Sequence, residues 1–154
     1  MIIIPLNAQE RAQSGFSHKI VSVASDWTDK TSGTAYSILP ALGTAASPTG
    51  SVTLPAGTII TKCAVNVTTA ATHASTVVMT IGDGGSAARF FPSTTVKTTG
   101  STPGTTTAVP YVYPAADTID ATLTVGAGAL STLTTLVMEI YFSIADNSLQ
   151  LQQS

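Results

Sequence analysis

Few residues in the chain have the type and spacing that chemistry requires. The segment Gly82–Ser86 resembles a phosphate-binding loop in its glycines, but it lacks the Lys-Ser/Thr pair of such a loop. Asp83-Gly84 is instead a strong β-hairpin signal. Arg89 follows this turn. We expect it to form a surface ion pair with Asp83, worth under about 1 kcal/mol, or to contact a partner.

Neither the histidines nor the carboxylates predict a catalytic or metal site. His18 and His73 are far apart, and neither has a Cys or a carboxylate at metal-ligand spacing. Strand geometry predicts that Asp117 and Asp120 lie on opposite faces, so they are not placed to act together as an acid–base pair. Cys63 is the only cysteine, and we expect a small half-buried thiol. We therefore predict that the chain is not an enzyme and has no catalytic residue, metal or cofactor.

The chain carries unusually little charge. Charged residues make up 9% of its 154 residues and hydrophobic residues 44%, whereas charged residues are about 25% of ordinary domains. The deficit falls on the surface, where Thr, Ser, Ala and Gly reduce both charge repulsion and the entropy lost on contact. Such a surface is typical of a protein that assembles with other proteins.

Charge and hydropathy also exclude several partners. A net charge of −2 provides no basic patch for direct binding of nucleic acid. No segment approaches the roughly 20 apolar residues of a membrane span. The opening Met1–Leu6 is apolar but lacks the basic region of a signal peptide. We expect synthesis and assembly in a cytoplasm, with no membrane partner.

Apolar residues alternate with polar ones along much of the chain, which predicts an all-β, antiparallel β-sandwich or jelly-roll-like domain. The expected strands are 19–24, 34–39, 58–67, 76–81, 117–125 and 136–144. In the strand 58–67 we expect Thr61, Cys63, Val65 and Val67 to share one face.

The last strand has the clearest alternation. The residues expected on its inner face are Leu136, Met138, Ile140, Phe142 and Ile144. Tyr141 lies on the opposite face, which we expect to be apolar enough to form an interface. Burial of each large side chain is worth about 1.5–3 kcal/mol.

We divide the chain into an extended N-terminal arm (1–16), one β-sandwich domain (17–146) and a C-terminal tail (147–154). The arm begins with three isoleucines and a proline, which opposes helix. Fully extended, 16 residues reach about 50 Å, enough to cross a neighbouring subunit. The arm residues expected to bind a partner are Ile2, Ile3, Ile4 and Leu6.

Aromatic residues gather in two short segments, Phe90-Phe91-Pro92 and Tyr111–Pro114. Such residues pack the edge of a sandwich or the axis of an oligomer, or they contact a glycan as exposed rings. The further candidate partner-binding residues are Arg89, Tyr111, Tyr113 and Tyr141.

Together these patterns resemble the capsid decoration, or cement, proteins and related head-fibre proteins of tailed bacteriophages. The resemblance covers about residues 50–144 and rests on Leu54-Pro-Ala-Gly57, Ile81-Gly-Asp-Gly84 with Arg89-Phe90, Tyr113–Ile119 and the final Val-Met-Glu-Ile-Tyr strand. It implies a virion subunit, often a homotrimer, that binds the major capsid protein on the outer capsid surface, with the arm clamping a neighbour. A tail or fibre component and a glycan-binding β-sandwich module are the alternatives.

Overall fold

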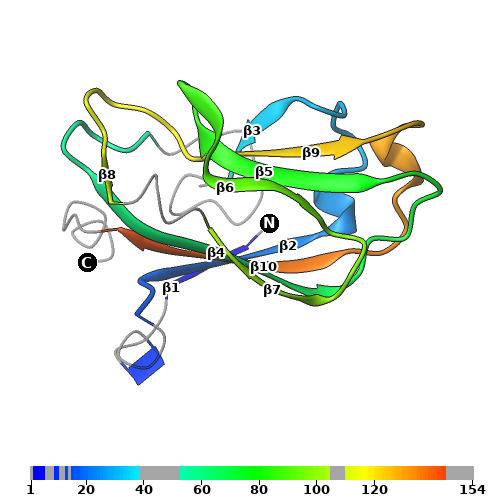
Figure 1. The fold of residues 1–154 in the computed structure, drawn as a ribbon, viewed down its shortest axis with the longest axis horizontal. Helices are drawn as coiled ribbons and strands as arrows, with labels where there is room; N and C mark the ends of the chain where they lie inside the picture. The colour runs from blue at the N-terminus through cyan, green and yellow to red at the C-terminus, as the bar shows by residue number, and fades with distance from the viewer. Residues whose placement is uncertain are drawn as a thin grey trace.

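The chain folds into two antiparallel β-sheets packed face to face, as seen in a computed structural model (Figure 1). The structure describes residues 2–5, 9–10, 13, 15–38, 53–104 and 110–144. The two layers confirm the all-β sandwich that the alternation predicts. The segment between the predicted strands 34–39 and 58–67 is described only from Thr53 onward, and the predicted tail 147–154 lies outside the described residues.

The larger sheet, sheet A, has the strand order β1-β2-β10-β4-β7, with β8 pairing with β4 off this path. Its strands are β1 (Ile2–Pro5), β2 (His18–Val23), β4 (Ile59–Thr69), β7 (Gly100–Pro103), β8 (Tyr111–Val112) and β10 (Val137–Ile144). Sheet B has the order β3-β9-β5-β6. Its strands are β3 (Ala35–Ser37), β5 (Val77–Asp83), β6 (Ser86–Thr95) and β9 (Asp120–Val125). Two short 3₁₀ helices, η1 (Ala24–Asp26) and η2 (Leu130–Thr132), lie in the connections.

The strand pairs are nested along the chain. β5 pairs with β6, β4 with β7, β3 with β9 and β2 with β10, each pair enclosing the one before it. The pairs enter the two sheets alternately, and β10–β4 and β9–β5 contacts join them into sheets. The fold is therefore one long antiparallel hairpin rolled into two layers, with the β5–β6 turn at its tip.

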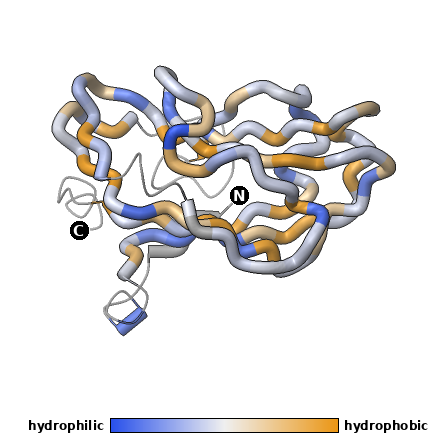
Figure 2. Tube along the Cα trace, viewed as in Figure 1, coloured by the Kyte–Doolittle hydropathy of each residue, from blue (hydrophilic) through white to orange (hydrophobic). Residues whose placement is uncertain are grey.

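The core lies between the layers and is built mostly from alternate residues of the strands, while β6 contributes the consecutive residues Phe90 and Phe91. Met138, Ile140 and Phe142 of β10 are fully buried, as expected, and the same alternation buries Met79 of β5 and Leu123 of β9. Figure 2 shows hydrophobic residues recurring along the strands of both layers. Most of the core therefore follows from the two-residue alternation of side chains along the strands of both sheets.

Trp27 and Cys63 both belong to the core. The Trp27 ring is buried, and its Nε1–H donates to Ser22 Oγ at 2.8 Å, so its polar atom is satisfied inside the protein. Cys63 is buried rather than half-buried, and burial raises the pKa of its thiol. A neutral thiol of this kind is a packing group.

One expectation about β4 is wrong. Ile60, not Thr61, joins Cys63 and Val65 on the buried face. The pairing with β10 shifts between Ser143 and Ile144, so that Thr61 is the extra residue of a β-bulge. A bulge reverses the alternation on one side of it, and the sequence of β4 alone does not locate it.

The N-terminal residues differ from a free extended arm. Residues 2–5 form β1, which pairs antiparallel with β2 of the same chain, and Ile3 lies opposite Ile20. The backbone at residues 9, 10 and 13 is helical. The first residues are therefore the edge strand of sheet A, and Leu6 lies outside the described residues.

Candidate functional site

Six polar and aromatic residues meet where the β5–β6 turn packs against the segment that leads into β9, and we call them the tip cluster. They are Asp83, Arg89, Tyr111, Tyr113, Asp117 and Asp120. Asp83 ends β5, Arg89 lies on β6 and Tyr111 on β8, while Asp120 begins β9. The cluster therefore depends on two parts of the chain, the β5–β6 hairpin and the segment from β8 to the start of β9.

The ion pair at its centre is a buried one. Arg89 Nε lies 2.6 Å from Asp83 Oδ2, and the Asp83 side chain is 1% exposed while that of Arg89 is 25% exposed. Asp83 Oδ1 accepts hydrogen bonds from the backbone N–H groups of Gly85 and Ser86. The expected surface ion pair is thus wrong in one respect: the turn folds over the carboxylate and removes it from water. Breaking such a pair costs more than breaking an exposed one.

Arg89 also lies over a group of aromatic rings that contact one another. Its guanidinium lies 4.2 Å from the centroid of the Tyr111 ring, a cation–π contact. The Tyr111 ring meets Tyr113 and Phe90 edge-on, with centroids 5.5 and 5.8 Å apart. Tyr113 is 1% exposed and its hydroxyl donates to the carbonyl of Thr118, and burial raises its pKa. Tyr113 therefore packs the core of the tip.

The burial of these rings bears on the glycan-binding alternative. That alternative needs exposed rings among Phe91, Tyr111 and Tyr113. Phe91 and Tyr113 are each 1% exposed, and the half-buried Tyr111 lies under Arg89. In the described residues these rings do not form an open platform.

The charges of Asp117 and Asp120 are electrostatically coupled. Asp117 lies before β9, which begins at Asp120, so the two residues do not share the strand that the sequence predicts. Asp117 Oδ1 accepts from the N–H groups of Thr118 and Gly84. Burial raises the pKa of Asp120, and the charges of Asp117 and Asp83 raise it further against a hydrogen bond from Thr118. The bond from Gly84 shows that the segment before β9 lies against the β5–β6 turn, which brings Asp83 close enough to act on Asp120 as well. Within the described residues no group of three or more His, Cys, Asp or Glu is placed to hold a metal ion.

The outer face of sheet A carries a second polar network, centred on Glu139 of β10. Lys19 Nζ donates to Glu139 Oε1 at 3.3 Å, and Asn66 Nδ2 and the Tyr141 hydroxyl donate to Oε2 at 3.3 and 2.8 Å. The bond from Tyr141, helped by Asn66 and Lys19, lowers the pKa of Glu139. Burial and the Glu139 charge raise the pKa of Tyr141 to about 12. One carboxylate thus ties β2, β10 and β4 together.

This network corrects the expectation of an apolar face around Tyr141. The Tyr141 ring is half-buried and lies against Phe16, with centroids 5.5 Å apart. Lys62 Nζ lies 5.8 Å from the centroid of the Phe16 ring. The face is therefore polar, and the segment before β2 already covers part of Tyr141.

The outer face of sheet B is different in kind. Thr80 of β5 lies opposite Thr122 of β9, and Val78 lies opposite Thr124. Ala35 of β3 flanks Thr122 on the other side. Of the outward positions described on β5 and β9, Asp120 alone is ionisable, and it lies at the tip. The other outward positions of these two strands, Val78, Thr80, Thr122 and Thr124, present methyl and hydroxyl groups without charge.

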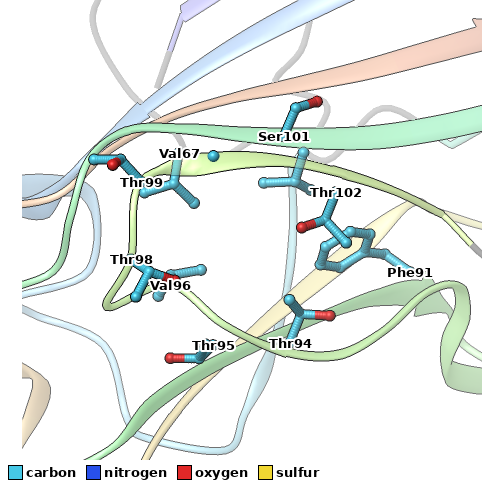
Figure 3. A pocket seen from close by; sticks show the side chains of 11 residues that line it. Val67, Phe91, Thr94, Thr95, Val96, Thr98, Thr99, Ser101 and Thr102 are labelled. Atoms are coloured by element: carbon cyan, nitrogen blue, oxygen red, sulfur yellow. The ribbon is translucent and has the colours of Figure 1, made fainter.

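A groove opens between β6 of sheet B and the β4–β7 edge of sheet A (Figure 3). Its volume is about 320 Å³, its apolar lining consists of Val65, Val67, Phe91 and Val96, and threonines supply most of the rest. These side chains include no acid, base or thiol. The groove can hold an apolar group, but it has no residue that could perform chemistry.

The sequence-predicted contact residues fall into three places. Arg89, Tyr111 and Tyr113 meet in the tip cluster, Tyr141 lies on the outer face of sheet A, and Ile2, Ile3 and Ile4 form β1 at the sheet edge. Sequence reasoning missed Glu139, although it is the only carboxylate in the predicted strand 136–144. It also missed Phe16 and the burial of Asp83, which no local pattern signals.

Comparisons with known proteins give distant structural similarities. No family model and no curated protein matches the chain. A chain of the cyanophage Pam1 capsid asymmetric unit is similar with a TM-score of 0.49 and 18% identity, covering 81% of each chain. A chain of the acidic stable capsid of Helicobacter pylori bacteriophage KHP30 has a TM-score of 0.46 and 14% identity, covering 82% of this chain and 88% of that one. At these scores the similarities carry no conclusion about function.

The described residues include no helix that is both long enough and apolar enough to span a membrane.

Proposed function

We propose that the chain is a non-enzymatic structural protein of a tailed-bacteriophage virion, a capsid decoration or cement subunit that stabilises the shell from outside. The observation that carries the proposal is the uncharged outer face of sheet B. It presents Thr80, Thr122, Thr124 and Val78 in two paired rows. Short side chains without charge lose little entropy and little hydration when a flat partner covers them.

The connectivity of the sandwich supports the same proposal. Four nested strand pairs divided between two sheets correspond to a jelly roll, a fold found in viral capsid and lectin domains. A fold alone does not determine a function. The buried aromatic rings argue against the lectin-like alternative, whereas the sheet B face supports a protein partner.

The proposed partners are the major capsid protein and further copies of the chain, with a homotrimer as the expected oligomer. The proposed location is the capsid surface of the virion, after assembly in the host cytoplasm. A tail or fibre component is the remaining candidate, because it would use the same kind of uncharged surface on a different part of the particle.

Binding to capsids tests the proposal directly. Capsids of the virus that encodes the chain, stripped of it, are mixed with the purified protein and sedimented, and the oligomer is measured by light scattering. We expect a trimer that co-sediments with capsids. A stable monomer that stays in the supernatant contradicts the decoration role and favours a tail or fibre position.

A pair of matched variants tests the sheet B face. Thr80→Lys places a charge on that face, and Thr68→Lys places the same charge on the outer face of sheet A, where Thr68 is exposed. We expect Thr80→Lys to lose capsid binding and Thr68→Lys to keep it. Equal binding by the two variants would show that sheet B does not meet the shell.

The N-terminal residues are proposed to clamp a neighbour, with Ile2, Ile3, Ile4 and Leu6 as contacts. Deletion of residues 1–15 removes β1 but leaves β2 paired with β10. We expect the truncated protein to fold and to lose capsid binding. Full occupancy of capsids by the truncated protein would remove the clamp from the proposal.

A further inference from the structure

We propose that the tip cluster is a pH-sensitive clasp, in which protonation of Asp120 tightens the packing of the β5–β6 turn against the segment from Tyr111 to Asp120. The proposal concerns this chain alone and does not depend on the proposed function. Its basis is that the described residues of the cluster include three carboxylates and one cation, and that hydrogen bonds connect Asp83 and Asp117 to the turn.

Each element around Asp120 contributes identifiable groups. The titratable and charged ones are Asp83 from β5, Arg89 from β6, Tyr111 from β8, and Tyr113 and Asp117 from the segment before β9. β3 contributes the neutral Ser37 opposite Asp120. Among these described groups there are three carboxylates and one guanidinium.

That guanidinium is directed to Asp83. Its Nε lies 2.6 Å from Asp83 Oδ2, and its plane covers Tyr111 at 4.2 Å from the ring centroid. Asp83 also takes two backbone N–H groups of the turn. Asp83 is thus the best neutralised carboxylate of the three, and the repulsion within the cluster falls on Asp117 and Asp120.

Asp120 is the carboxylate that protonation relieves first. Burial raises its pKa, and the negative charges of Asp117 and Asp83 act in the same direction. The folded chain therefore binds this proton more tightly than the unfolded chain does. The contribution to stability grows as the pH falls from neutral through the raised pKa, and it is complete below the ordinary value of 3.8.

The backbone next to Asp120 is closely packed against the β5–β6 turn. Asp120 lies opposite Gly82 of β5. Gly82 packs so closely on the backbone of Ser86 and Ala87 that a Cβ there would overlap it. Asp117 holds the N–H of Gly84 from the other side. A loss of repulsion among the carboxylates therefore acts on residues 82–87 directly.

The full-length Asp120→Asn variant tests the clasp, because Asn has the shape of the protonated acid and can still accept from Thr118. We expect a Tm higher than wild type by about 2 °C at pH 7. We expect no difference at pH 3, where Asp120 is protonated in the wild type as well. Hydrogen exchange at pH 7 should show the amides of residues 84–86 better protected in the variant.

Asp29→Asn is the matched control. Asp29 lies in a different turn, and its pKa is lowered by Lys30, so neutralising it should not raise the Tm at pH 7. The clasp is refuted if Asp120→Asn lowers the Tm at pH 7, or if it changes the Tm equally at pH 7 and pH 3. A higher Tm without added protection at residues 84–86 also refutes it, because the effect would then lie outside the turn.

Discussion

The two outer faces of the sandwich use polar residues in opposite ways. On sheet A, Glu139 accepts hydrogen bonds from Lys19, Asn66 and Tyr141, so its charge is used within the subunit to hold three strands. On sheet B, the rows of Thr80–Thr122 and Val78–Thr124 contain no charge. The difference teaches that the Glu139 charge is used within the subunit, whereas these rows of sheet B hold no such internal ionic bond and are the face that the proposed function assigns to a partner.

A charge in the core between the two sheets has the largest expected effect on stability. Ile140 is fully buried in β10, and an aspartate there would bury a carboxylate with no partner. We expect Ile140→Asp to unfold the protein, since the loss is comparable to a whole domain stability of about 5–15 kcal/mol. Circular dichroism should show no cooperative melting transition.

Thr68→Asp is the matched control for Ile140→Asp. Thr68→Asp places the same carboxylate on an exposed position of the neighbouring strand. It should melt close to wild type. An Ile140→Asp protein that melts like Thr68→Asp would contradict the two-layer core.

Arg89→Ala has the next largest effect, because it removes the cation from a carboxylate that is 1% exposed. We expect a loss of about 2–3 kcal/mol in the free energy of unfolding, measured by urea denaturation. Lys30→Ala is the control, since the Asp29 side chain of that pair is 71% exposed, and it should leave the urea midpoint unchanged. Equal midpoints for the two variants would mean that the tip pair behaves as a surface pair.

Glu139→Gln sharpens the comparison between the faces through its pH dependence. The pKa of Glu139 is lowered in the folded chain, so its stabilisation is present above its unfolded value of about 4.3 and is lost as the pH falls through the folded value. We expect a loss of about 1 kcal/mol at pH 7 that disappears at pH 2–3. If the loss of stability is the same at pH 3 and pH 7, the effect comes from the changed shape of the side chain and not from its charge.

Thr80→Lys should have the smallest effect on folding. The sheet B face makes no ionic contact at this position that a lysine could break, so the change in stability should stay within about 0.5 kcal/mol. Thermal melting of the isolated subunit measures it. A large destabilisation would show that this face is needed by the fold itself, and the contrast with sheet A would disappear.

The sequence predicted the parts of the fold that depend on a local pattern. β10, β5 and β9 were found because their alternate residues are buried, and burial repeats every two residues whatever strand lies beside them. The bulge at Thr61 was not found, because it depends on the register with Ser143 and Ile144 of another strand.

The candidate site was predicted less well, for the same physical reason. Arg89 and Asp83 are close in sequence, and their pairing was expected. The coupling of Asp83 to Asp120 and the hydrogen bond from the Gly84 N–H to Asp117 depend on the segment before β9 folding onto the β5–β6 turn, a contact between distant parts of the chain. The Glu139 network likewise needs three strands to be aligned before it can be recognised.

The nested strand pairing also determines when the protein can fold. β2, near the start of the chain, pairs with β10, and Lys19 and Glu139 are 120 positions apart in sequence. Contacts between strands so far apart in sequence form slowly, because a large part of the chain must close into a loop before they can form. During synthesis, β2 has no permanent neighbour on that side until β10 emerges, so sheet A cannot be completed before the chain has been made as far as Ile144.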